Sequence, residues 1–437
     1  MFSKTSVQSA MEIGKIDLTD MMANSIDLWE KMLEERAPWV NGDSVVSLGL
    51  EAAVCREFSN VVLSEMDTTL GNEELDPLYQ RAVADLFEHF QDGLGLGCMV
   101  VKPIGNTGKF EYISANNIIP VSYSDDGTLR DVVFLQVKRI NDTETYVRAE
   151  RHALTKEGLK IQNRAFRGTE SSFGTPVPLD VVDEWASLPE EVTYPIDRMD
   201  FGFYKNPLPN RIDRSKQGVS IFHTAIEKIK KADIQYGRLD WEYESGERAV
   251  MADWSFFDKS QGHFRMPKGK ERMFIATEQD DAWHDHSPVL RDQSYINGLN
   301  EYKRQIEFDC ALAYGDLSKN EQVEKTAQEI RAAKNRKYNM VNAIQKKLRV
   351  CLEDLAWAIA FYNLQYNSDL GFECSFHDSI KTDEETERTQ DRLDVANGVM
   401  SKVEYRMKWY GEDEKTAAAN IAKAMEVANA MSQEPID

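Results

Sequence analysis

The longest regular pattern of apolar positions lies between residues 326 and 365. No Pro or Gly interrupts this stretch, and apolar side chains recur at alternating steps of three and four, at Val341, Ile344, Leu348, Cys351, Leu355, Ala358 and Tyr362. Such spacing predicts one α-helix with a single apolar stripe. A helix of roughly 40 residues would be on the order of 60 Å long, whereas the average helix has about 11 to 12 residues. We expect the stripe from Val341 to Leu355 to form a seam, in the core or between subunits.

The first half of this helix is strongly basic. Lysine and arginine dominate from Lys325 to Arg349, where Glu329 is the single acid. Two interpretations stay open. The run is a solvated helix face that pairs with acids on neighbouring elements, or it is a surface that meets a polyanion or an acidic neighbouring subunit.

Apolar periodicity predicts further helices on both sides of a β-rich section. Helical signals begin near Leu48 and recur at 77–90, 219–246, 295–313 and after 382, where Ser401 opens a capping box. Alternating, β-branched stretches predict strands at 98–104, 109–113, 118–123, 129–138, 146–153 and 158–166. We also expect a small β-structure at 249–275, an irregular segment at 278–286 and a short strand at 372–376. The expected fold class is α+β and mainly helical.

The composition is that of an ordinary globular protein. The chain has 437 residues, of which 42% are hydrophobic and 29% charged, so we expect roughly two to four substructures. The five cysteines include no CxxC pair, which argues against a zinc site or a disulfide framework and fits a reducing cytosol. The longest apolar run, 355–362, is too short for a membrane span, and no signal peptide is recognisable. We therefore expect no membrane partner.

The net charge limits the way in which the protein could meet nucleic acid. A charge of −22 argues against a surface that grips phosphates, because such a surface needs clustered Lys and Arg. It leaves open DNA that must slide past without sticking.

Three short motifs are better interpreted as structure than as catalytic or metal sites. Gly105 to Lys109 has two residues between its glycines where a phosphate loop has four, and a strand follows it, so we expect a hairpin turn. Gly93 to Gly97 follows a helix instead of a strand and is expected to stop that helix. His284, Asp285 and His286 could bind a metal, but no third element supplies a ligand. The sequence provides no catalytic residues, and we expect no cofactor and no enzyme activity.

Several segments, taken in order, resemble the portal proteins of long-tailed bacteriophages, in the branch found in phages of Gram-positive hosts. Residues 93–102 after two helices resemble the family's wing segment, and 213–226 with Asp233, Tyr236 and Glu244 resemble its first stem helix. Lys325-Thr-Ala-Gln-Glu-Ile330 is similar to the family's Lys-Thr-Ala-Thr-Glu-Val signature. The likeness covers roughly residues 25 to 430. It departs at 313–319, where the family has a Gly-Leu-Ser-Xaa-Gly run.

The resemblance implies a portal fold, in which a ring of typically twelve subunits surrounds a central channel. Its parts would be a wing (1–212), a first stem helix (213–246), a clip (247–290), a second stem helix (291–313), a tunnel loop (314–323), a long wing helix with its strand (324–381) and a crown (382–437).

Two groups of site residues follow from this assignment. The tunnel loop would face DNA in the channel through Tyr314, Gly315, Asp316, Leu317, Ser318, Lys319 and Asn320. The clip has a basic cluster that would hold DNA or an acidic partner, formed by Lys268, Lys270 and Arg272.

The resemblance also implies partners and a location. They are other copies of the chain, double-stranded DNA passing through the ring, the terminase large subunit, the major capsid and scaffolding proteins, and a head-completion or adaptor protein. The ring would sit at one vertex of the virion and assemble in the host cytoplasm. Two other classes stay open on the residues alone: an acidic intracellular scaffold whose long helix forms a coiled-coil dimer, and a nuclease or transferase with an unrecognised site.

Overall fold

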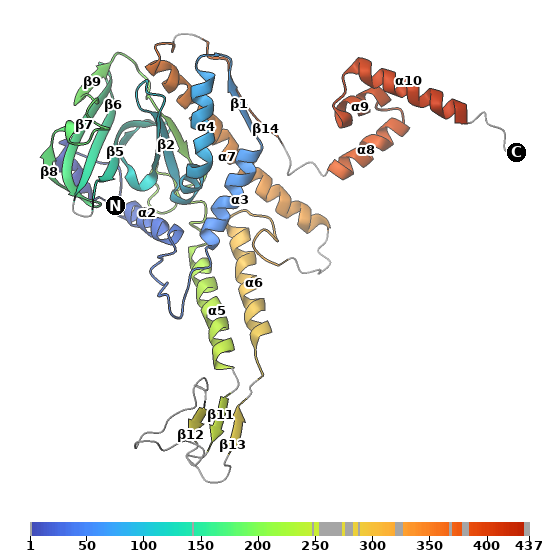
Figure 1. Ribbon diagram of the computed structural model, residues 1–437, viewed down its shortest axis with the longest axis horizontal. Helices are drawn as coiled ribbons and strands as arrows, with labels where there is room; N and C mark the ends of the chain where they lie inside the picture. The colour runs from blue at the N-terminus through green and yellow to red at the C-terminus, as the bar shows by residue number, and fades with distance from the viewer. Residues whose placement is uncertain are drawn as a thin grey trace. The chain divides into compact units, whose positions relative to one another are not determined.

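A computed structural model of the chain (Figure 1) describes residues 2–141, 144–246, 249–252, 273–275, 283–286, 289–319, 327–366, 369–377 and 384–431. The chain divides into two compact units, 1–376 and 377–437. None of the helices in these described ranges combines the length and the apolar content that crossing a membrane requires.

The first unit begins with helices whose apolar faces are buried. They are α1 (Lys4–Met11), α2 (Asp20–Leu33), α3 (Leu50–Ser64) and α4 (Asp76–Leu96). In α3, Val54, Phe58 and Val62 recur at steps of four and are fully buried, so this helix presents one face to the core. In α4, Pro77 lies in the first turn, where its missing N–H costs no hydrogen bond.

A six-stranded antiparallel sheet follows these helices in the sequence. It contains, in spatial order, β4 (Ile118–Tyr123), β5 (Leu129–Arg139), β6 (Thr145–Thr155), β7 (Gly158–Thr169) and β8 (Ser172–Val177), with β9 (Glu191–Tyr194) paired to β7. Short 3-10 turns, η1 (Ala115–Asn117) and η2 (Leu179–Val181), flank it. Leu159, Ile161 and Ala165 point into the core from alternate positions of β7, as expected for a sheet with one solvated face.

Two smaller sheets complete the body of this unit, by which we mean its residues outside 226–309. One has the order β10 (Gly202–Lys205), β2 (Cys98–Pro103) and β3 (Phe110–Ser114), and the other pairs β1 (Met66–Leu70) with β14 (Phe372–Phe376). The long helix α7 (Ala327–Tyr362) packs against β10, β2, β14 and α3. At Gly202 of β10 an added Cβ would lie 2.3 Å from the Cys351 carbonyl oxygen, so glycine is required for this close approach.

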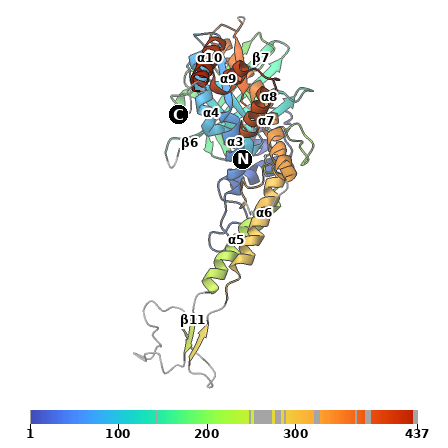
Figure 2. The ribbon, with the colours of Figure 1, turned by 90° about the vertical axis from the view of Figure 1, so that its right-hand side faces the viewer.

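Two antiparallel helices, which we call the stalk, leave the body side by side (Figures 1 and 2). They are α5 (Ile226–Ser245) and α6 (Asp292–Asp309). Between them in the sequence lies a small sheet with the order β12 (Met273–Ile275), β11 (Ala249–Ala252) and β13 (Trp283–His286), at the far end of the stalk. The second unit contains α8 (Glu384–Ala396), α9 (Lys402–Tyr410) and α10 (Glu414–Met431). Ser401 and Glu404 form the expected capping box at the start of α9.

The expectation of a mainly helical protein is wrong. The chain is 45% helical and 21% strand, with a six-stranded antiparallel sheet. The alternating strands from 98 to 166 were recognisable in the sequence, but β1, β8, β9 and β10 were not. These four strands have only four to six residues each. Strands of similar length, such as β3 and β14, were predicted, so length alone is not the reason. The hydrogen-bond partners of these four strands supply an order that their local pattern does not indicate.

Two local expectations are also corrected. The helix expected to end at Phe90 continues to Leu96, and Gly93 and Gly95 lie inside it, whereas Gly97, in the left-handed conformation with φ of +97°, ends it as expected. A Cβ at Gly93 would come within 2.7 Å of the Met99 sulfur, so close packing, and not the end of the helix, explains that glycine. The segment 278–286, expected to be irregular, contains the strand β13. The turn from Gly105 to Lys109 is a hairpin between β2 and β3, as expected.

The sheets of the body enclose a network of buried charges. The Lys102 ammonium, on β2, contacts Glu111 at 2.8 Å and Glu150 at 2.9 Å, and Arg148 contacts the same two carboxylates at 2.8 and 3.1 Å. Burial alone would raise the pKa of Glu150, but the charges of Lys102 and Arg148 outweigh it and hold that pKa well below its usual range. Each buried charge therefore has partners, as its desolvation requires.

His152 extends this network toward α7. Its Nδ1 lies 2.7 Å from Asp200 and its Nε2 lies 2.9 Å from Glu150, while the Tyr362 hydroxyl donates to Asp200. Burial by itself would lower the pKa of His152. The charge and hydrogen bond of Asp200, and then those of Glu150, outweigh it and raise the pKa to about 9.

We predict that Leu348→Ala lowers the free energy of unfolding by about 2 to 5 kcal/mol, because it leaves a cavity at a fully buried position of α7. Lys346→Ala, on the exposed face two residues earlier, should change it by less than about 0.5 kcal/mol. Urea unfolding of both variants tests this. Equal midpoints would contradict the packing of α7.

We predict that His152→Gln costs more stability at pH 6 than at pH 9.5. The folded state holds the imidazolium proton more tightly than the unfolded state, so this contribution is complete below pH 6.5 and disappears as the pH rises through about 9. It is on the order of 3 kcal/mol. The measurement is the difference in unfolding free energy between the variant and the original protein across this range. A difference independent of pH would show that His152 is neutral in the fold.

Candidate functional site

The loop after α6 is the candidate site that the sequence pointed to, and one buried carboxylate holds it. Glu307, in the last turn of α6, is fully buried. Its Oε1 accepts hydrogen bonds from the backbone N–H groups of Gly315, Leu317 and Ser318 at 3.1, 2.7 and 2.7 Å. Its Oε2 accepts a bond from the Ser318 hydroxyl at 2.9 Å. A single side chain thus satisfies four donors and gives the loop one definite shape.

The backbone of the loop also depends on a glycine. Gly315 has φ of +103°, a conformation that residues with a Cβ rarely adopt. This turn lets the backbone N–H groups of Gly315, Leu317 and Ser318 point at the same oxygen of Glu307. Replacement of Gly315 by a larger residue would therefore strain the loop at its anchor.

The long helix α7 holds the loop from the other side. The Lys337 ammonium lies 2.9 Å from Asp316 and 3.7 Å from Glu57 of α3. Arg336 donates to the Leu312 carbonyl, and its guanidinium lies over the rings of Phe308 and Tyr314 at 4.8 and 5.2 Å. The loop is therefore clamped between the end of α6 and the basic part of α7.

The expected tunnel-loop residues lie together in this clamped segment as far as it is described. Ser318 is buried, whereas Lys319 is exposed and its backbone N–H donates to the Asn300 side chain at 2.8 Å. Asn320 lies outside the described residues. Among the described residues 314–319, Lys319 is the one whose side chain is exposed.

The other two expected groups are placed differently. Lys268, Lys270 and Arg272 lie outside the described residues. The seam residues Val341, Ile344, Leu348 and Leu355 are buried within their own chain. In the body α7 packs against strands of two sheets and against helices.

The basic residues of α7 fall into two groups, one that contacts the loop and one that is exposed. Arg336 and Lys337 contact the loop, as described above, and match the interpretation in which basic residues pair with neighbouring elements. Lys346, Lys347 and Arg349 are exposed and remain available to a partner.

Sequence reasoning missed Glu307 as a functional residue. It stands beside Ile306, which belongs to the apolar stripe of its helix, and an acid next to such a stripe is normally solvated. The signal that could have found it is the turn-forming segment Gly315-Asp-Leu-Ser318 after the predicted helix. Backbone donors in such a turn need a buried acceptor, but sequence does not specify which acid supplies it.

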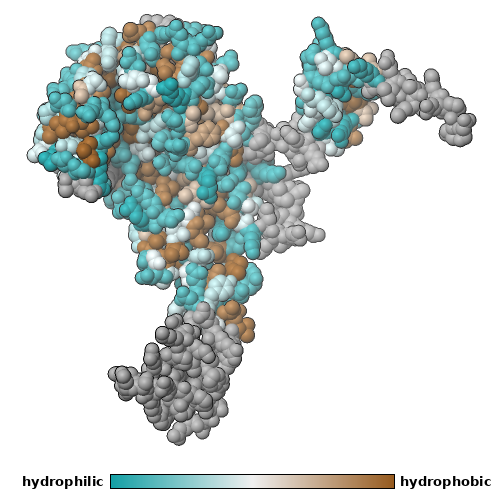
Figure 3. All heavy atoms as spheres, viewed as in Figure 1, coloured by the Kyte–Doolittle hydropathy of each residue, from teal (hydrophilic) through white to brown (hydrophobic). Residues whose placement is uncertain are grey.

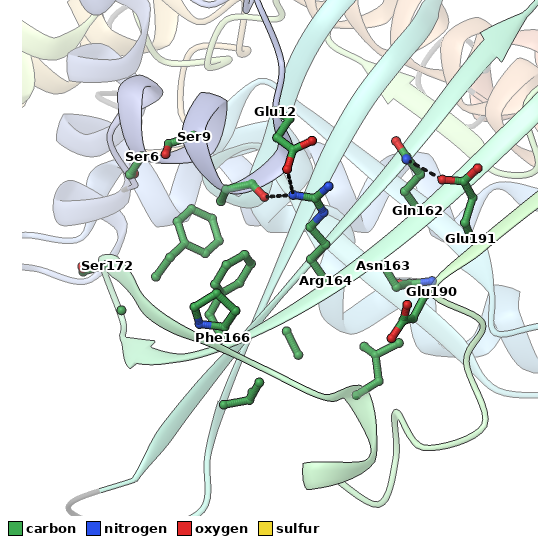
Figure 4. Close-up of a pocket in the computed structure, with 17 residues that line it drawn as sticks. Ser6, Ser9, Glu12, Gln162, Asn163, Arg164, Phe166, Ser172, Glu190 and Glu191 are labelled. Atoms are coloured by element: carbon green, nitrogen blue, oxygen red, sulfur yellow. Dashed lines mark hydrogen bonds and ion pairs between the residues drawn. The ribbon is translucent and has the colours of Figure 1, made fainter.

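A cavity with a volume of about 750 Å³ lies between α1 and the strands β7, β8 and β9 (Figure 4). Arg164 crosses it and donates to Glu12 and to the Ala10 carbonyl, both at 3.0 Å. Gln162 donates to Glu191 at 2.8 Å. The residues that line the cavity include no nucleophile with a base beside it, so its geometry supports no catalytic assignment.

Metal and thiol chemistry have no candidate in the described part of the chain. No cluster of three or more His, Cys, Asp or Glu side chains there is arranged to hold a metal ion. His284 to His286 lie in β13. All five cysteines are buried and unpaired.

A scan against models of known protein families and a search among curated proteins both return no match for this chain. The functional interpretation therefore depends on the geometry of the stalk and its loop and on the motifs described above.

We predict that Glu307→Gln releases the loop. The amide cannot accept all four hydrogen bonds, and its NH₂ group would face donors, at a cost of about 1 to 3 kcal/mol for each unsatisfied group. Hydrogen exchange at Gly315, Leu317 and Ser318 should become faster. Glu301→Gln, on an exposed position of the same helix, is the control and should leave these amides protected. Unchanged exchange in Glu307→Gln would contradict the anchor.

Proposed function

We propose that this chain is the subunit of a portal ring of a long-tailed bacteriophage, through which double-stranded DNA enters and leaves the capsid. The observation that carries the proposal is the order of parts along the chain. A two-helix stalk with a small sheet between its helices leads directly into an anchored loop and then into one long helix. This order is the one that the sequence resemblance implies.

The two helices of the stalk are joined mainly by polar contacts. Ion pairs hold it at both ends, between Lys228 and Asp309 at 2.7 Å and between Arg291 and Glu242 at 2.7 Å. Few apolar side chains of its helices are buried: Ile229, Ala232, Leu239 and Ile306.

Its outer surface suits lateral neighbours. Trp241 is 66% exposed and Phe308 53% exposed, and hydrophobic residues reach the surface over the stalk (Figure 3). Two helices alone bury too little apolar surface for a stable bundle. Copies arranged in a ring would cover these side chains, since repeated heterologous contacts close when the rotation between copies closes.

The charge of the chain suits a conduit. A ring of subunits that each carry −22 repels the phosphates of a duplex in its channel, while a few exposed lysines such as Lys319 give weak and reversible contacts. The ring would be passive, without ATPase activity, and the packaging motor would supply the energy.

The partners follow from this role. The small sheet at the end of the stalk would dock the terminase large subunit during packaging and a head-completion or adaptor protein afterwards. The body would contact the major capsid and scaffolding proteins. The ring would be part of the virion after assembly in the host cytoplasm.

A coiled-coil scaffold is the alternative, and the packing of α7 disfavours it. A coiled-coil dimer needs an apolar stripe that is free to meet a second helix. The stripe of α7 is buried against sheets and helices of the same chain. No second helix can reach it while the body is folded.

The mass of the native particle tests the proposal. A ring of about a dozen chains of 50.0 kDa has a mass on the order of 600 kDa, against about 100 kDa for a dimer. We predict the larger mass by native mass spectrometry, a ring with a central hole in electron micrographs, and no ATP hydrolysis by that ring. A monomer or a dimer at all protein concentrations would refute the ring, and ATP turnover abolished by Lys109→Ala would refute the passive conduit.

A further inference from the structure

Within the first unit, one irregular segment of the body lies directly against the stalk. Residues 37–49 lie between α2 and α3, contain no helix or strand and run beside α5 (Figure 1). We call them the clasp. At Gly237 of α5 an added Cβ would lie 1.9 Å from the Ser44 carbonyl oxygen. The backbone of the clasp therefore contacts the backbone of the stalk, which only a residue without a side chain allows.

One carboxylate of α5 joins the two ends of the clasp. Asp233 is buried, and its Oδ2 accepts a hydrogen bond from the Trp39 indole N–H at 2.8 Å. Its Oδ1 accepts a bond from the backbone N–H of Leu48 at 3.0 Å. The Lys230 ammonium, three residues earlier on α5, lies over the Trp39 ring at 5.8 Å from its centroid. While Asp233 keeps both donors, the clasp is closed on the stalk.

A second carboxylate lies next to the clasp, at the start of α3. Glu51 is buried, and its Oε1 accepts a hydrogen bond from the Ser47 hydroxyl at 3.4 Å. Its Oε2 is also buried and has no hydrogen-bond partner in the described part of the chain. Glu307, by contrast, is a buried carboxylate with four donors. A negative charge on Glu51 would lack such donors, and burial of an unsatisfied charge is costly.

The charges that act on Glu51 are negative. Burial has the largest effect and raises the pKa of Glu51 to about 7. The carboxylates of Asp233, on α5, and Glu35, just after α2, raise this pKa further, whereas the Glu51 backbone N–H and the Ser47 hydroxyl act in the opposite direction. The other titratable groups near this junction are two thiols and another acid: Cys55, Cys310 and Asp92.

We infer that the clasp is a proton-controlled latch between the body and the stalk. With a proton on Glu51, the clasp stays closed on α5. When Glu51 releases that proton to water, a second buried negative charge stands near Asp233, and the open clasp becomes more populated because opening hydrates both charges. The latch lies within one chain, so it goes beyond the proposed ring and does not depend on it.

The direction of the pH dependence follows from the two states of the clasp. In the closed clasp the pKa of Glu51 is about 7, and in the open clasp Glu51 meets water, where a glutamate has a pKa of about 4.3. Between these two values the closed state holds one proton more than the open state. The equilibrium constant for opening therefore rises by up to about tenfold per pH unit in this range and is constant above it. Asp233, whose pKa is raised by burial, acts in the same direction.

Amide hydrogen exchange of the full-length protein, read by mass spectrometry, tests the latch. A protection factor divides the intrinsic exchange rate by the measured rate, which removes the ordinary effect of pH on exchange. We predict that the protection of the Leu48 amide, which donates to Asp233, falls by about a hundredfold between about pH 5 and pH 7 and then stays constant to about pH 8. The amides of β2, a buried strand of the body, should show no such fall.

Two variants separate the proton on Glu51 from other causes. Glu51→Gln resembles the protonated side chain, so the protection of Leu48 should lose most of its pH dependence. At about pH 8 it should be on the order of a hundredfold higher than in the original protein. Asp240→Asn removes an exposed acid of α5 and is the control, which should keep the pH dependence of the original protein. Thermal unfolding establishes that both variants are folded.

Each result of this comparison decides for or against the latch. A fall in the protection of Leu48 in the original protein and in Asp240→Asn, but not in Glu51→Gln, supports it. The same fall in all three proteins, or no fall in the original protein, overturns it. A fall of equal size in β2 would show that the whole unit responds to pH, and it would also overturn the latch. If Glu51→Gln does not fold, the comparison of Leu48 with β2 in the original protein still decides.

Discussion

The buried apolar stripe of α7 is the packing on which the rest of the structure depends. The apolar side chains of this stripe between Val341 and Leu355 are buried within the chain. Gly202 allows the helix backbone to approach β10 closely. Dispersion and hydrophobic burial along several helical turns fix the rotation of α7 about its axis. Once that rotation is set, every polar residue on the helix has a defined direction.

The contacts that hold the loop after α6 follow from this fixed direction. Arg336 and Lys337 contact the loop after α6, and further along the helix Lys347 and Val350 line the cavity between the β4–β5 turn, β10 and α7. The same helix therefore connects the base of the stalk with the sheets of the body.

The buried charge network has a different role. Lys102, Arg148, Glu150 and His152 belong to strands of two sheets, and Asp200 brings in Tyr362 of α7. Such a network is weak support for stability in itself, because desolvation offsets much of its Coulomb energy. It does specify register, since a shifted strand would leave charges buried without partners. We attribute to it the relative placement of the two sheets and the end of α7.

The sequence by itself determined the elements whose patterns are local and long. The strands from 98 to 166, the stalk helices and α7 follow from apolar spacing over many residues, and the hairpin at Gly105 follows from its turn residues. Tertiary structure alone decided the rest. The short strand β1 exists because it pairs with β14, about 300 positions away. Inside α4, Gly93 and Gly95 leave room for the side chains of Met99 and Leu33, which pack against them. Glu307 anchors the loop because folding buries it beside four donors. Contacts between residues far apart in the chain leave no periodic pattern, so these features cannot be recognised before the fold brings their residues together.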